Sequence, residues 1–236
     1  MTKHLVGIHH ITAIAGDPQA NIDFYAGLLG LLIKVTVNFD DPGTYHLYYG
    51  DGAGNPGKIL TFFPWPDAPK GRHGTGQVTH IAFAVPRNAL DFWRDRLASR
   101  GIAVGENSSR FDESLLSFND PDGTNIELVS TGAVNRERVY SDATIPVSYA
   151  IHGIHSATLS EGGYQKTAEL LTGILGFRLV HREGKRFRYS LGEGAPRSIL
   201  HVLCAPEDGH GSILAGTVHH IAFRTPSDRE QQEWLN

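Results

Sequence analysis

Histidines recur at matching places along this sequence, and their spacing points to metal chemistry. Four segments share a pattern: GIHHITAIAGDP from Gly7, QVTHIAFAVPRN from Gln77, HGIHSATLSEGG from His152 and TVHHIAFRTPSD from Thr217. Aligned, they place His10, His80, His155 and His220 in one column. A lone histidine on a strand is usually a packed or surface residue, but four in register indicate an internal repeat with a repeated role. Neutral imidazole is the commonest protein ligand of metals.

A metal site of this kind needs ligands that arrive from different walls of a cavity. Two histidines and one carboxylate, with open positions, suit non-haem iron(II) and oxygen chemistry. The sequence offers Glu127 in GTNIELVS, an acidic residue inside an otherwise apolar alternating run. The alternative interpretation of Glu127 is a charge on an edge strand that faces water.

The elements that position these residues follow a βαβββ pattern in each repeat. In the first unit, Asp17 and Pro18 predict the N-cap and first residue of a helix, and Gly30 predicts its end. Strand-like runs follow: LLIKVTVNFD, TYHLYYGD and KILTFFPW. Apolar residues at helical spacing support that helix, and they are Ile22, Tyr25, Ala26 and Leu29.

The later units repeat this order. The second has a helix with Leu90, Trp93 and Leu97 on one face, and its strands are predicted around Ala103, Leu115 and Ile126. The third continues with TAELLTGILG, FRLVHREG, FRYSLG and SILHVLC, and the fourth reaches only a strand and a helix. Because an open sheet of this kind leaves one curved face uncovered, two units side by side form a cup. We therefore predict an α+β fold of four tandem units, the last incomplete, forming two cup-shaped curved sheets.

The predicted boundary between halves is a polar connector. Residues 1–130 would form the N-terminal pair of units, 131–148 the connector and 149–236 the C-terminal pair. Side chains alternate along a strand, so His10 shares a face with Ile8 and Thr12 while His9 turns away. A β-bulge would be needed to bring His9 or His219 to the same face.

Composition narrows the partners to small molecules. The formal net charge is −4, without the basic cluster that nucleic acid or an anionic membrane would require. No signal-peptide pattern and no apolar run of about 18 residues is present, which predicts a cytoplasmic protein with no membrane partner. Exposed sheet edges favour a homodimer.

The first-unit motifs resemble a known family. Three segments are similar to the hydroquinone and catechol ring-cleaving dioxygenases of the vicinal-oxygen-chelate superfamily: HHITAIAGDPQANIDFYAGLLGL, VNFDDPGTYHLYYGD and TFFPWP. The resemblance covers essentially the whole chain. It implies an iron(II) enzyme, with Mn, Zn and Ni as alternative metals, whose partners are a small aromatic diol and dioxygen.

The resemblance also implies site residues. The family's two histidine ligands match His10 and His220, and its nearby polar residues match His9, Thr12 and His219. His9 or His219 would move protons, and Thr12 would hydrogen-bond a substrate oxygen. The family's third ligand is a glutamate in the last strand of the fourth unit, but this sequence ends before that strand, so we expect it to stop short of a complete copy.

The middle units keep a second candidate set of residues. Glyoxalase-like members of the superfamily use four aligned positions for their metal ligands. Here these positions hold His80, Glu127, His155 and His201. They form either a relic with hydrogen-bonded histidines or a second metal site. Two other functions therefore stay open: a glyoxalase-like metal-dependent isomerase or lyase in the middle cup, and a non-catalytic small-molecule-binding protein.

Overall fold

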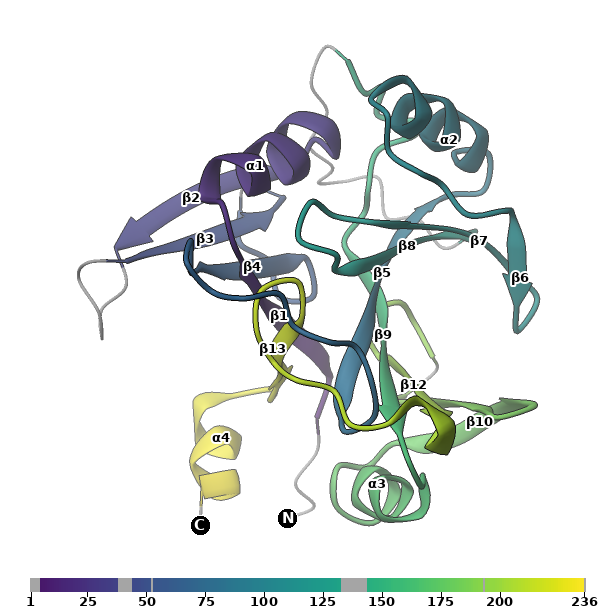
Figure 1. Ribbon diagram of the computed structural model, residues 1–236. Helices are drawn as coiled ribbons and strands as arrows, with labels where there is room; N and C mark the ends of the chain where they lie inside the picture. Colours follow the sequence, from purple (N-terminus) through teal and green to yellow (C-terminus); the bar gives the residue numbers. More distant parts are fainter. Residues whose placement is uncertain (1–4, 38–43, 52, 133–143, 193, 236) are drawn as a thin grey trace.

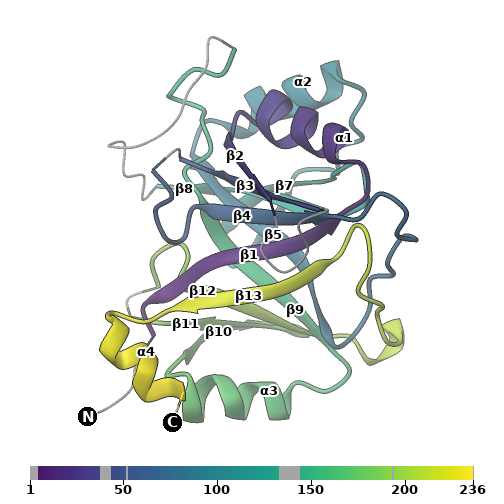
Figure 2. The same cartoon turned by 90° about the vertical axis from the view of Figure 1, so that its left-hand side faces the viewer.

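The computed structural model describes residues 5–37, 44–51, 53–132, 144–192 and 194–235. The strands form two sheets, and short helices lie at two opposite ends of the molecule (Figures 1 and 2). The helices α1 and α2 lie together at one end, whereas α3 and α4 lie at the other (Figure 2). Most of the connector predicted at residues 131–148 falls outside the described residues, so the domain division stays a prediction.

The first sheet combines the first and fourth units. Its order is β13-β1-β4-β3-β2. Its strands are β1 (Gly7–Ala15), β2 (Leu32–Val37), β3 (Tyr45–Gly50), β4 (Ile59–Pro64) and β13 (Val218–Arg224). Strand β13 pairs antiparallel with β1, and Figure 2 shows the two side by side. We call the concave side of this sheet, which carries His10 and His220, the front cup.

The second sheet combines the second and third units. Its order is β10-β11-β12-β9-β5-β8-β7-β6. Its strands are β5 (Gln77–Pro86), β6 (Ser108–Arg110), β7 (Glu113–Asn119), β8 (Asn125–Thr131), β9 (Ile154–Glu161), β10 (Arg178–Glu183), β11 (Arg186–Ser190) and β12 (Ile199–Cys204). Antiparallel pairing of β5 with β9 joins the two units. This is the middle cup, so units one and four share one sheet and units two and three share the other.

Each complete unit places its helix between its first two strands. The helices are α1 (Pro18–Ile22) with the π-helix η1 (Asp23–Leu28), α2 (Leu90–Ser99), α3 (Gln165–Glu169) with the π-helix η3 (Leu170–Ile174), the 3₁₀ turn η4 (Pro206–Asp208) and α4 (Asp228–Leu235). The Asp17 carboxylate accepts hydrogen bonds from the backbone N–H groups of Gln19 and Ala20, as expected of an N-cap. Gly30 follows the helix with φ of 69°, the left-handed conformation typical of a helix end.

Two details of the predicted elements differ from the structure. The first helix changes from α to π winding at Asp23, a local insertion that the regular spacing of apolar residues does not reveal. The strand predicted around Ala103 is wrong: Val104 makes only an isolated bridge to Phe118, and β6 begins at Ser108. The face of α2 that carries Leu90, Trp93 and Leu97 is buried as predicted.

One hydrophobic core joins both sheets. It includes Ile11 of β1, Leu60 of β4, Ile81 of β5 and Val202 of β12, all of them fully or almost fully buried. Because these strands come from all of the first three units, the core fixes the positions of the histidine-bearing strands relative to one another. Within the described residues, no helix has the length and apolar character needed to cross a membrane.

Candidate metal centre

The two doubled histidines of the front cup both lie at irregularities in one strand pair. The β1–β13 register shifts between Ile8 and His10, so that His9 is the extra residue on β1. It shifts again between Thr12 and Ala13, where their partners are His220 and Val218, so that His219 is the extra residue on β13. A bulge sets two successive residues against one partner and turns their side chains toward a common side. These are the bulges that strict alternation required for His9 and His219.

The bulges bring four imidazoles into a short chain. His9 Nδ1 lies 2.9 Å from His10 Nδ1, and His219 Nδ1 lies 2.8 Å from His220 Nδ1. His10 Nε2 and His220 Nε2 lie 3.3 Å apart. Each central imidazole is therefore held through Nδ1 by its neighbour in sequence, while both Nε2 atoms point at the same place.

This arrangement fits two ligands of one metal ion. Metal–imidazole bonds of about 2.1 Å would separate two neighbouring ligand nitrogens by about 3.0–3.4 Å, which matches the observed 3.3 Å. Outer hydrogen bonds to the second ring nitrogen are typical of histidine ligands, because they fix the ring and its tautomer. No group of three or more His, Cys, Asp or Glu side chains within the described ranges forms a complete site. The ligand roles of His10 and His220 stay predictions.

The electrostatics of the front cup keep these histidines neutral. Burial, and then the neighbouring His9, His220 and His46, lower the pKa of His10 to about 4. Burial is also the main cause that lowers the pKa of His220. A metal competes with protons for imidazole nitrogen. Near neutral pH both rings are therefore already in the form that a metal binds.

Thr12 connects the histidine pair to the next strand. Its hydroxyl oxygen lies 3.0 Å from His220 Nε2 and 2.8 Å from the Thr61 hydroxyl on β4. Both threonines are buried. With no metal bound, the Thr12 hydroxyl can donate to the His220 lone pair that a metal would otherwise use.

Sequence reasoning missed three polar residues of the front cup: Thr61, His46 and Tyr48. His46 Nδ1 lies 2.8 Å from the Tyr48 hydroxyl, and the His46 ring packs 4.5 Å from the Phe63 ring, centroid to centroid. Burial, followed by His220, lowers the pKa of His46. A signal was present for two of them, since Tyr48 and His46 alternate with the core residues Leu47 and Tyr49 on one strand.

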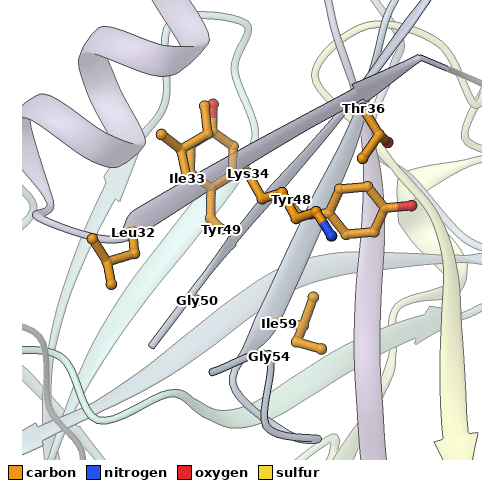
Figure 3. Close-up of a pocket in the computed structure, with 9 residues that line it drawn as sticks. All are labelled: Leu32, Ile33, Lys34, Thr36, Tyr48, Tyr49, Gly50, Gly54 and Ile59. Carbon is orange, nitrogen blue, oxygen red and sulfur yellow. The ribbon is translucent and has the colours of Figure 1, made fainter. Parts of the chain in front are cut away.

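A cavity of about 540 Å³ opens on the same sheet. Figure 3 shows its walls, which come from β2, β3 and the start of β4. The lining residues are Leu32, Ile33, Lys34, Thr36, Tyr48, Tyr49, Gly50, Gly54 and Ile59. Ile59 is the register partner of His10, so one wall of the cavity comes from the strand that lies next to β1. Its volume and largely apolar walls are those of a small-molecule site.

The middle cup holds arginine where its predicted site would hold a cation. Arg110 on β6 reaches Glu127 on β8 through both guanidinium nitrogens, at 3.0 and 2.5 Å. Glu127 is 3% exposed, so it is neither a free ligand nor a charge facing water. Burial raises the pKa of Glu127, but Arg110 outweighs this effect and the net pKa is lowered.

The other members of the middle cup are also engaged. His155 Nε2 lies 3.1 Å from Glu113, which also binds Arg188. Arg188 Nε donates to His201 Nε2 at 3.1 Å. His80 Nδ1 contacts the Thr79 hydroxyl. The Nε2 lone pair of His201 is thus occupied, and the charges around it are cationic, which does not favour a metal. The second site at His80, Glu127 and His155 remains an untested prediction that this geometry does not support.

The chain is similar to known proteins over nearly its whole length. The model of the Glyoxalase/Bleomycin resistance protein/Dioxygenase superfamily matches residues 7–128. The "Putative ring-cleaving dioxygenase MhqO" of Bacillus subtilis (strain 168) is 44% identical over 237 residues, which cover 99% of this chain and 74% of that protein.

Two further comparisons extend this likeness. The chlorohydroquinone/hydroquinone 1,2-dioxygenase of Sphingobium indicum is 29% identical over 94% of this chain and 71% of its own length. A crystal structure from Bacillus subtilis subsp. subtilis str. 168 is 43% identical, with a TM-score of 0.92 over 99% of this chain and 74% of that one. The fold described above is therefore that of a solved relative.

Proposed function

The chain belongs to the Glyoxalase/Bleomycin resistance protein/Dioxygenase superfamily, and we propose that it is a non-haem iron(II)-dependent dioxygenase that cleaves the ring of an aromatic diol, of the hydroquinone or catechol type. The observation that carries the proposal is the His10–His220 pair, with its two Nε2 atoms 3.3 Å apart. The names of the relatives support ring cleavage as the reaction.

His10 and His220 would hold the metal, and a carboxylate would be the third ligand of such a set. Iron(II), when bound, would supply a template for an electron-rich ring and dioxygen, and a path for charge between them. The apolar walls of the cavity would enclose the ring and exclude water. The Thr12 hydroxyl would bind a substrate oxygen in place of its contact with His220.

His9 and His219 would orient the ligand rings and handle protons. Burial, followed by Arg224, lowers the pKa of His9, so this imidazole is neutral near pH 7 and able to accept a proton from a substrate hydroxyl. His219 is exposed and packs edge-on against Phe63 at 5.7 Å between ring centroids. It would exchange protons with solvent.

Metal content and oxygen uptake test the proposal together. The protein would be loaded anaerobically with iron(II), desalted, analysed for iron, and then supplied with hydroquinone or catechol in an oxygen-electrode cell. Wild type is expected to retain iron and consume oxygen, and His10→Ala is expected to lose both because one of two nitrogen ligands is gone. His155→Ala, in the middle cup, is the matched histidine control and is expected to retain both.

Other outcomes would redirect the assignment. Loss of metal only in His155→Ala would move the site to the middle cup and make the dioxygenase proposal wrong. Parallel loading with Mn, Zn and Ni identifies the metal, since zinc or nickel binding without oxygen uptake would indicate isomerase or lyase chemistry. Absence of metal binding in wild type would leave a small-molecule-binding protein.

A further inference from the structure

The front cup carries an ordered row of polar side chains that extends well beyond the histidines. Strand register places His220 beside Thr12, Thr12 beside Thr61, Thr61 beside Tyr48 and Tyr48 beside Lys34. The row thus crosses all five strands of the sheet on one face. Two of its contacts are hydrogen bonds, one between His220 and Thr12 and one between Thr12 and Thr61.

The neighbouring row on the same face is apolar. It begins at His10, whose register partner is Ile59, and it includes Gly50, whose partner is Leu32. Ile59, Gly50 and Leu32 line the 540 Å³ cavity together with Tyr48 and Lys34. The cavity therefore has one polar and one apolar edge. The polar edge belongs to the row that contains His220, and the apolar edge to the row that contains His10.

Lys34 is the cation at the far end of the polar row. Figure 3 shows its side chain and that of Tyr48 extending from adjacent strands into the same space. Among the residues that the structure describes, none forms an ion pair with the Lys34 ammonium group. An exposed ammonium group that lines a ligand-sized cavity together with a tyrosine, and that forms no ion pair within the described residues, is suited to an acidic oxygen on a ligand.

We propose that Lys34, with Tyr48, is a specificity-determining residue that binds an acidic oxygen on the side of the aromatic substrate opposite the metal-binding histidines. The proposal rests on the proposed function for the position of the ring, but the preference itself is a binding property. The oxygen belongs either to a second ring hydroxyl or to a carboxylate substituent, which share the ability to carry negative charge and accept hydrogen bonds from an ammonium group.

The dimensions of the sheet agree with this placement. Neighbouring strands are about 4.8 Å apart, so β3 and β2 lie about 10 and 14 Å from β1 along the sheet. The curvature of the cup and the long lysine side chain shorten the gap between the histidine pair and the ammonium group. A single ring with polar groups at opposite ends, together with a metal–oxygen bond at one end and an ammonium–oxygen hydrogen bond at the other, spans about 10 Å, whereas a ring with both hydroxyls on one side would leave Lys34 without a partner.

Three ligands that differ only opposite a shared hydroxyl test the inference. Phenol has a hydrogen there, hydroquinone a hydroxyl, and 4-hydroxybenzoate a carboxylate. Their dissociation constants would be measured anaerobically by calorimetry with the iron-loaded protein. Wild type is expected to bind at least one of the two oxygen-bearing ligands about 3- to 10-fold more tightly than phenol, the range for one hydrogen bond to a partly exposed charge.

Variants then assign the preference to Lys34. Lys34→Met is expected to remove the preference over phenol while leaving phenol binding unchanged, because phenol does not reach residue 34. Lys70→Met, an exposed lysine outside the cavity, is the matched control and should keep it. Tyr48→Phe, which keeps the ring but loses the hydroxyl, should reduce the same preference, whereas Tyr45→Phe, at the exposed start of β3 on the face opposite Tyr48, should not.

The outcomes separate the inference from the proposed function. A Lys34-dependent preference for hydroquinone alone identifies a ring hydroxyl, and one for 4-hydroxybenzoate alone identifies a carboxylate. Equal binding of all three ligands, or an equal loss for all three in Lys34→Met, overturns the inference. Oxygen uptake that is insensitive to Lys34 overturns it while leaving the dioxygenase intact. A Lys34-dependent preference without oxygen uptake overturns the dioxygenase and leaves the subsite.

Discussion

At the scale of single residues, the doubled histidines divide two tasks between neighbours. One member of each pair presents Nε2 to the candidate metal position, and the other holds its Nδ1. A single histidine on a regular strand would need a partner from elsewhere in the fold to fix its ring. Here the partner is the preceding residue, so one bulge supplies both the ligand and its support.

Thr12→Val tests whether Thr12 contacts substrate or only the protein. Valine keeps the shape of threonine but removes the hydroxyl that bridges His220 and Thr61. We expect iron content to be unchanged, because Thr12 is not a ligand, and kcat/KM for the aromatic diol to fall about 10-fold through the loss of one hydrogen bond. Elemental analysis and oxygen uptake measure the two quantities.

Thr75→Val is the matched control for this substitution, since Thr75 is also buried but donates to Gly209 between the sheets. It is expected to keep both iron and kcat/KM. A loss of iron in Thr12→Val would contradict a substrate contact and would instead indicate that Thr12 maintains the position of His220.

At the scale of elements, the bulges mark the limit of what the sequence could predict. Period-two alternation identified the strands and correctly placed His10 and Thr12 on one face, but it wrongly added Ile8, because the bulge at His9 turns Ile8 to the core side. It could not locate the extra residues, because a bulge is defined by the partner strand, and β13 lies about two hundred positions away in sequence. The same holds for Thr61, which becomes part of the site only through its register with Thr12.

In the middle cup, the sequence likewise could not predict which charged side chains contact the candidate ligands. Alignment of the repeats correctly grouped units two and three. It compares only residues at equivalent positions of the repeat, and Arg110 and Arg188 lie at positions where no unit has a candidate ligand. Only the structure shows that their guanidinium groups bind Glu127 and His201. The π-helical half of the first helix was equally invisible, since one inserted residue barely disturbs the spacing of apolar positions.

Arg110→Met tests the role of the guanidinium between β6 and β8. The change leaves the Glu127 carboxylate buried without its bidentate partner, and we expect the free energy of unfolding to fall by about 3–5 kcal/mol. The double variant Arg110→Met, Glu127→Leu removes both charges and is expected to recover most of that loss. Urea unfolding followed by circular dichroism measures each value.

Lys185→Met is the control for this pair, because it breaks an ion pair with Glu207 that is exposed on both sides; we expect no change in stability. If the double variant were as unstable as Arg110→Met alone, the guanidinium would contribute through packing rather than by compensating the carboxylate. A gain of metal binding by Arg110→Met would show that the arginine replaces a cation.

At the scale of the whole molecule, the front cup closes the chain on itself. Among the described residues β1 is the first strand and β13 the last; these two pair, and the candidate ligands lie one on each. A metal bound by His10 and His220 would therefore tie two distant segments, and its binding free energy would oppose their separation.

Amide hydrogen exchange measures directly how strongly a bound metal opposes the separation of β13 from β1. With manganese(II), which is stable in air, at about 100 times its dissociation constant, we expect amide exchange by local opening in β13 (Val218–Arg224) to slow by up to about 100-fold. Strand β12 (Ile199–Cys204) in the middle cup is the internal reference and should not change. The His10→Ala variant should show no metal effect, and equal slowing of both strands would contradict a site confined to the front cup.

The pairing of β1 with β13 also determines when, during synthesis of the chain, the candidate metal site can form. His10 and His220 are 210 residues apart in sequence, and a ribosome that adds about 5–20 residues per second needs about 10–40 s to cover that distance. During that interval β1 has β4 on one side but lacks the neighbour that supplies the second imidazole. The middle cup, whose strands are all made earlier, can form first, and the front cup can bind its metal through both histidines only after synthesis has passed residue 220.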